Sequence, residues 1–158
     1  MTDFKINWGN TTDFTLTNLH SLAGGNIWAS NAIADGDPSH DRVQISFSLH
    51  CDGSVAADEQ IIFRLARGDD NTSEIRDAGI STSEQEISTA NTISDIQDML
   101  PPIKVVRIDR INQDVDGVFT IYDPGPDWQL LIELDSSSGA LDASGSVVSY
   151  RLGTTASV

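Results

Sequence analysis

Two neighbouring segments near the end of the chain decide the fold: DWQLLIELD (Asp127–Asp135) and SVVSYRL (Ser146–Leu152). In the first, large apolar side chains at every second position alternate with polar Gln129 and Glu133, and the second segment alternates in the same way. A period of two residues predicts a β-strand that buries one face. The segment between them is rich in Ser, Gly and Asp, which favour turns. We therefore expect two strands joined by a tight loop into a hairpin.

The same alternation recurs upstream, most clearly in Val43–Leu49, where four apolar residues alternate with polar ones. Shorter alternating runs lie near residues 14–18, 27–32, 61–66, 106–109 and 119–122. Turn-forming Gly, Pro, Asp and Asn separate these runs, so the sequence predicts about eight antiparallel strands. We expect an all-β fold, an antiparallel β-sandwich or a jelly-roll-like arrangement. At most one short helix is expected, over Ser94–Leu100, capped by Ser94 and ending before Pro101.

The chain has 158 residues and one cysteine, which predicts a single domain without an intramolecular disulfide. We assign residues 1–12 to an N-terminal arm and residues 13–158 to one β-sandwich domain. The arm is polar but carries three large apolar side chains. An apolar side chain in such an arm is better explained by docking on a neighbouring subunit than by exposure to water. The interface candidates are Phe4, Ile6 and Trp8.

The charge is strongly negative, with 24 acidic against 9 basic residues and a net charge of −15. Such a surface repels phosphate backbones, so we expect no nucleic-acid partner. A basic protein surface would suit it as a partner, although charge alone informs solubility more than fold. The sequence holds no apolar run long enough to span a membrane and no secretion signal, so we expect no membrane association.

No pattern of residues predicts catalysis. The sequence lacks a Gly-x-Ser-x-Gly elbow, a phosphate-binding loop and a His-x-x-x-His pair. We therefore expect no enzymatic activity, no catalytic residues and no cofactor, and a hydrolase is disfavoured. One alternative from another functional class is a carbohydrate-binding module. In that module Trp8, Trp28 and Trp128 would form a sugar-binding platform, whereas the simpler interpretation places Trp128 in the core.

The strongest metal candidate is the acidic segment NQDVDG that begins at Asn112. Asn112, Asp114, Asp116 and Asp123 fall at the first, third, fifth and twelfth positions of an EF-hand calcium loop. The chain departs from that motif because the last ligand is Asp rather than Glu and because Pro124 follows where a helix should begin. An acidic turn between two strands is the favoured interpretation, and calcium binding is the weaker one.

The C-terminal segments also resemble a family, the small structural proteins of tailed bacteriophages. The matching residues are an apolar strand (Leu130–Leu134), Ser138-Gly139, Ala140-Leu141, Ser144-Gly145 and Val148-Ser149-Tyr150-Arg151. An earlier stretch, Leu19–Ile33, is similar to the same family in its Ser-Leu-Ala-Gly-Gly run and in the Trp28 strand that follows. The chain departs from the family before the glycine turn, where it has Leu134-Asp135.

The resemblance implies a β-sandwich virion protein without enzymatic activity that is made in the bacterial host cytoplasm and incorporated into the virion. The expected function is that of a capsid decoration or cement protein that binds the outside of the head and stabilises it. The alternative within the same particle is a tail, connector or fibre-base structural protein. The expected partners are the major capsid protein or other virion proteins, together with further copies of the chain in a trimer or dimer.

Overall fold

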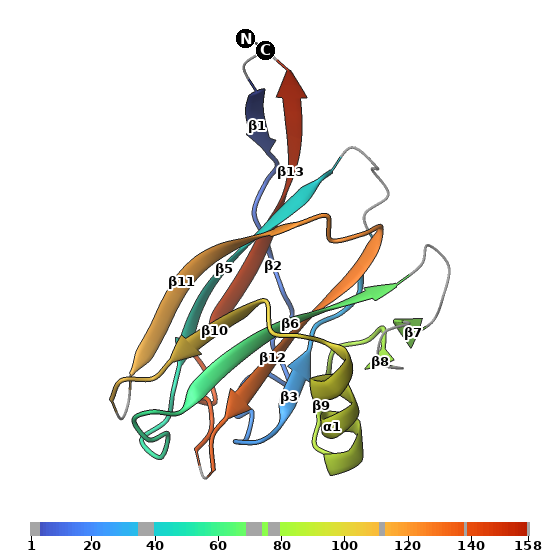
Figure 1. The fold of residues 1–158 in the computed structure, drawn as a ribbon. Helices are drawn as coiled ribbons and strands as arrows, with labels where there is room; N and C mark the ends of the chain where they lie inside the picture. The colour runs from blue at the N-terminus through green and yellow to red at the C-terminus, as the bar shows by residue number, and fades with distance from the viewer. Residues whose placement is uncertain are drawn as a thin grey trace.

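The computed structural model describes residues 4–34, 40–68, 74–75, 80–110, 113–137 and 139–157. Within these residues the chain forms two antiparallel sheets that pack face to face, with one helix at the side (Figure 1). This arrangement confirms the all-β sandwich that the alternating segments predict.

The first sheet has the order β1-β13-β5-β11, with β2 also paired to β13, and the second has the order β10-β6-β12-β3-β9, with β4 also paired to β12. The strands of the first sheet are β1 (Phe4–Trp8), β2 (Thr12–Asp13), β5 (Arg42–His50), β11 (Asp114–Tyr122) and β13 (Val147–Ser157). Those of the second are β3 (Ile27–Ala29), β4 (Ile33–Ala34), β6 (Gln60–Gly68), β9 (Gln85–Ile87), β10 (Lys104–Arg107) and β12 (Asp127–Asp135). Outside both sheets are a two-stranded ribbon of β7 (Glu74–Ile75) and β8 (Ile80–Ser81), and the helix α1 (Ala90–Met99).

The principal strands follow jelly-roll topology. Their orders are β2-β13-β5-β11 and β3-β12-β6-β10. They arise because the chain changes sheet after β2, β4, β5, β10, β11 and β12. The predicted C-terminal hairpin is therefore wrong. Strand β12 pairs with β6 and β3 in the second sheet, whereas β13 pairs with β5 and β1 in the first. The turn-rich segment between β12 and β13 carries the chain from one sheet to the other.

The inner faces of both sheets meet in one apolar core. Strand β5 contributes every second residue, from Val43 to Leu49, as the alternation in its sequence predicts. Two groups of aromatic rings lie between the sheets: Phe47 and Phe63 with centroids 4.7 Å apart, and Trp128 and Tyr150 with centroids 5.5 Å apart. Edge-to-face and tilted pairs of this kind add to the stabilisation that comes from apolar burial alone.

Strand β12 is buried on both faces, so the prediction of a single buried face is wrong for it. Trp128, Leu130, Ile132 and Leu134 point into the sandwich core, but Leu131 on the other face belongs to a second apolar cluster. That cluster is completed by residues of the segment between β6 and β10, which includes β8, β9 and α1. In this segment β9 extends the edge of the second sheet, and residues of β8 and α1 pack on its outer face; the buried members are Ile80, Ile87, Ile96 and Leu100.

A buried ion pair lies beneath this cover. Arg64 on β6 and Glu133 on β12 are 5% and 3% exposed, and an Arg64 guanidinium nitrogen lies 3.0 Å from Glu133 Oε2. Gln97 on α1 donates to Glu133 Oε1 at 2.6 Å, and Arg64 also donates to the carbonyl of Leu100. Because buried charges are costly unless they are paired and hydrogen-bonded, these contacts fix α1 and the residue after it against the sheet.

The helix differs from its prediction. It begins at Ala90 after Thr89 rather than at Ser94, which lies exposed within it, and it ends at Met99 as Pro101 predicts. Ile96 and Leu100 are buried, but Met99 is 56% exposed. The partly buried Ile93 packs beside Ile96, so the apolar spacing of three and four residues extends one turn further back than Ser94 indicates.

Removing only one partner of the ion pair should destabilise the fold strongly. Glu133→Leu leaves the Arg64 charge buried without a counter-charge, and we expect unfolding free energy measured in urea to fall by about 3–5 kcal/mol. Arg64→Leu/Glu133→Leu should recover at least half of that loss because it removes both charges. Equal losses in the single and double variants would show that the charge pairing contributes little.

Candidate interaction surface

Both ends of the described chain meet in a ribbon that extends one edge of the first sheet. Strand β1 pairs antiparallel with the last part of β13, from Phe4 opposite Ser157 to Trp8 opposite Gly153. Figure 1 shows this ribbon projecting beyond the body of the sandwich, with the two ends of the chain at its tip. Here the ribbon means Phe4–Trp8 together with Gly153–Ser157. Within the predicted N-terminal arm, Phe4–Trp8 thus form a strand at the edge of a sheet.

All three interface candidates occupy one face of the ribbon. Phe4, Ile6 and Trp8 are spaced by two residues and therefore point to the same side of β1. Phe4 is 73% exposed and Ile6 is 41% exposed, whereas Trp8 is half-buried. Exposed apolar side chains side by side on a projecting edge are typical of a contact with another protein.

Trp8 packs onto the root of the ribbon because its cross-strand partner is a glycine. A Cβ at Gly153 would lie 2.7 Å from the Trp8 ring and 2.9 Å from Arg42 Cγ, closer than real Cβ atoms approach. The guanidinium of Arg151 lies over the Trp8 ring at 4.9 Å from its centroid. The space left by the absence of a side chain at Gly153 and the cation–π contact with Arg151 together hold the indole of Trp8 against the sheet.

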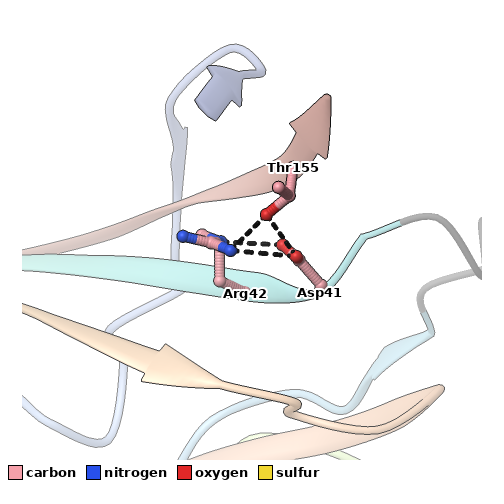
Figure 2. Close-up of polar contacts among 3 residues, drawn as sticks. All are labelled: Asp41, Arg42 and Thr155. Carbon is pink, nitrogen blue, oxygen red and sulfur yellow. Dashed lines mark hydrogen bonds and ion pairs between the residues drawn. The ribbon is translucent and has the colours of Figure 1, made fainter. Parts of the chain in front are cut away.

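Gly153 is the last residue of β13 that pairs with β5. Just beyond it, a polar contact among Asp41, Arg42 and Thr155 fixes the point where the two strands separate (Figure 2). Arg42 donates to the two carboxylate oxygens of Asp41 at 2.7 and 2.9 Å, and Thr155 donates to Asp41 Oδ2 at 2.5 Å. Arg42 also donates to the hydroxyl oxygen of Thr155. The hydrogen bonds from Arg42, and then that from Thr155, hold the pKa of Asp41 well below its usual range.

The outer face of the first sheet continues the surface on which Phe4, Ile6 and Trp8 lie. Cross-strand register places Trp8, Gly153, Arg42 and Tyr122 in one row across β1, β13, β5 and β11. Tyr122 is 66% exposed, and Arg42 lies over its ring at 5.4 Å. Further along, the open face consists of residues from β5, β11 and β13: Gln44, Ser46, Ser48, Asp116, Val118, Thr120, Val147, Ser149 and Arg151.

The open face contains a shallow groove of about 480 Å³. Short serine side chains, among them Ser46 and Ser48, lie between two valines that are exposed on either side. Val118 is 58% exposed and Val147 is 49% exposed. Among the described residues α1 packs on the outer face of the second sheet, and no comparable layer packs on the open face of the first.

The structure separates the calcium candidates. Asn112 lies outside the described residues, and Asp114 and Asp116 belong to β11, whose nine residues are extended. At about 3.3 Å per residue, Asp114 and Asp123 lie about 30 Å apart. An EF-hand loop must curl around one ion, so this strand excludes the predicted EF-hand-like site. The favoured interpretation is an acidic turn that ends where a strand begins at Val118. The strand β11 begins earlier, at Asp114, so the turn is shorter than expected.

Three other kinds of site can be checked in the described residues: a metal cluster, a reactive thiol and the tryptophan platform. These residues contain no cluster of three His, Cys, Asp or Glu side chains that could hold a metal ion, and no helix long and apolar enough to cross a membrane. Burial raises the pKa of the Cys51 thiol to about 11, with nearby Asp114 and Asp52 adding to the shift. The thiol is therefore protonated at neutral pH and is a poor nucleophile. Trp28 and Trp128 are fully buried, which confirms Trp128 as a core residue and leaves only Trp8 of the proposed sugar platform near the surface.

Adding a methyl group at Gly153 should displace Trp8. We expect Gly153→Ala to move the indole into solvent, with a red-shifted fluorescence component and stronger acrylamide quenching, because Trp28 and Trp128 are buried and contribute little quenching. Gly9→Ala is the matched control, since a Cβ there meets only Leu152 O at an ordinary 3.5 Å. Unchanged quenching in Gly153→Ala would contradict the close packing of Trp8.

Removing the Thr155 hydroxyl should weaken the attachment of the ribbon to Asp41 and Arg42. In Thr155→Val, Asp41 loses one of the two donors that stabilise its charged form, so its pKa, followed by carboxyl-carbon NMR, should rise while staying below the usual value because Arg42 remains. Amide hydrogen exchange in the last residues of β13 should also accelerate. Thr154→Val, on the opposite face of the ribbon, should change neither; equal effects from both variants would show that the hydroxyl has no special role.

Comparisons with known proteins do not assign this surface. No protein-family model matches the chain, and no curated protein matches it. The function is therefore argued from the ribbon, the open face and the resemblance of the C-terminal segments.

Proposed function

We propose that the chain is a virion structural protein of a tailed bacteriophage, without enzymatic activity, that binds the outside of the head as a capsid decoration or cement protein. The observation that carries this proposal is the asymmetry of the sandwich. One sheet is covered by α1, whereas the other presents an open face continuous with an exposed apolar ribbon. The resemblance of the C-terminal segments to phage structural proteins supports the same assignment.

The shape of the open face suits attachment to a larger surface better than capture of a small molecule. Its groove is shallow, and its exposed apolar groups are spread over two strands, with Val118 and Tyr122 on β11 and Val147 on β13. Small-molecule sites are usually concave and enclose most of their ligand. A protein that binds a shell in this way stabilises it by mass action, because it adds free energy only to the assembled state.

The partners in this proposal are the major capsid protein or other virion proteins, and the protein is made in the bacterial host cytoplasm before it joins the virion. A net charge of −15 favours a basic protein surface over nucleic acid. A place in the tail, the connector or the fibre base uses the same surface and remains the alternative within the particle. The carbohydrate-binding alternative loses its main support because two of the three tryptophans are core residues.

A charge placed on the open face should prevent attachment. The chain is coexpressed with the major capsid protein encoded in the same genome, and assembled shells are purified on a gradient. We expect the unaltered chain to sediment with the shells. Val118→Asp should weaken this binding by about tenfold or more, as expected when a charge enters an apolar contact.

Met99→Asp is the matched control because Met99 is exposed to nearly the same degree, 56% against 58% for Val118, but lies on α1 at the other side of the sandwich. This variant should still bind the shells. Shells that carry none of the unaltered chain would contradict the decoration role. Loss of binding in Met99→Asp but not in Val118→Asp would place the attachment surface on the helix side.

A further inference from the structure

The free edge of β1 has its hydrogen-bonding groups arranged to receive another strand. Gly9 donates to the carbonyl of Leu152 at 2.9 Å, which makes that pair a hydrogen-bonded one. Hydrogen-bonded and non-hydrogen-bonded pairs alternate along an antiparallel ladder. It follows that the N–H and C=O groups of Phe4, Ile6 and Trp8 point away from β13. Among the described residues, no strand pairs with that edge.

We propose that β1 pairs antiparallel with β1 of a second copy of this chain, about a two-fold axis that passes midway between Ile6 and Ile6 of the second copy. This register places Ile6 opposite Ile6 of the second copy and Phe4 opposite Trp8 of the second copy. All of these are residues whose backbone groups point outward, so each pair exchanges two hydrogen bonds. The result is one continuous sheet that runs through both molecules, with an isologous contact.

In this register the side chains of β1 are complementary to those of β1 in the second copy. On one face, the exposed Phe4 ring covers the half-buried Trp8 of the second copy, and aromatic cross-strand pairs are among the stabilising ones. On the other face, Lys5 lies opposite Asn7 of the second copy, so no like charges meet. An axis at Lys5 would set two ammonium groups opposite each other, and an axis at Asn7 would leave Phe4 without a partner strand.

Charge also favours this edge for self-association. The chain carries a net charge of −15, yet residues 4–12 and 152–157 contain no acidic side chain. Antiparallel pairing sends the two acidic bodies away in opposite directions, separated by a ribbon of about 17 Å, which exceeds the Debye length of about 8 Å at physiological salt. By contrast, the edge strand β11 carries Asp114 and Asp116 and would repel its own copy.

The contact is small compared with a standard protein interface, so we expect a dimer that dissociates in the micromolar to millimolar range. This inference does not rest on the proposed role in the virion, because it concerns the isolated chain. Self-association would, however, double the number of open faces that one attached unit presents, and linked sites bind more tightly than single ones.

Sedimentation velocity over a range of concentrations tests the pairing on the full chain. The unaltered chain should shift from monomer to dimer as its concentration rises. Ile6→Lys should abolish the shift because it places two ammonium groups opposite each other at the axis. Val105→Lys is the control: Val105 is 44% exposed against 41% for Ile6, and it lies on β10 at the edge of the other sheet.

The register is tested by Asn7→Asp, which would form two ion pairs with Lys5 across the axis. We expect the dissociation constant to fall by about fivefold at low salt, although the substitution makes each copy more negative. A chain that remains monomeric at all concentrations, or that forms a trimer, would overturn the proposal. So would weaker association in Asn7→Asp, or loss of the dimer in Val105→Lys with retention in Ile6→Lys.

Discussion

Burial of β12 on both faces is the constraint on which the rest of the molecule depends. Its inner face closes the sandwich core, and its outer face must be kept from water by something other than the first sheet. The segment between β6 and β10 meets that need with α1, which Gln97 ties to the buried ion pair of Arg64 and Glu133. Because this segment packs on the second sheet, the described residues leave the outer face of the first sheet open.

That surface joins two features of different physical character. The open face is broad, shallow and weakly apolar, which suits a large and flat partner. The ribbon is narrow and offers unpaired backbone groups together with aromatic and aliphatic side chains, which suits a strand. The register from Trp8 through Gly153 and Arg42 to Tyr122 places the ribbon and the open face side by side on one sheet. Charge repulsion between two acidic sandwiches limits where two copies can approach each other. The ribbon carries no acidic side chain, so this repulsion is weakest there.

The sequence predicts the strands far better than their partners. Alternation in Val43–Leu49 identifies β5 and its buried face correctly because the side-chain period is a local property. The prediction that β12 and β13 form a hairpin is wrong, because the same turn-forming residues occur in connections within one sheet and in connections between two sheets. Gln129 and Glu133 look solvent-exposed in the sequence, but in the fold Gln129 donates to the carbonyls of Ser30 and Ser81, and Glu133 accepts from Arg64 and Gln97. The contact of Asp41 and Arg42 with Thr155 spans more than a hundred residues and has no local signal.

Phe4 and Ser157 face each other across the ribbon, so the chain enters and leaves the fold at almost the same place. A loop of two or three residues could bridge that gap, since hairpins are commonly closed by loops of that length. The domain could thus be made circular, or opened at a surface turn far from the ribbon, without altering its sheets. It also follows that a purification tag or a fused cargo joined next to Phe4 or Ser157 would lie beside the free edge of β1, whereas one inserted in a turn at the far end of the sandwich would leave that edge clear.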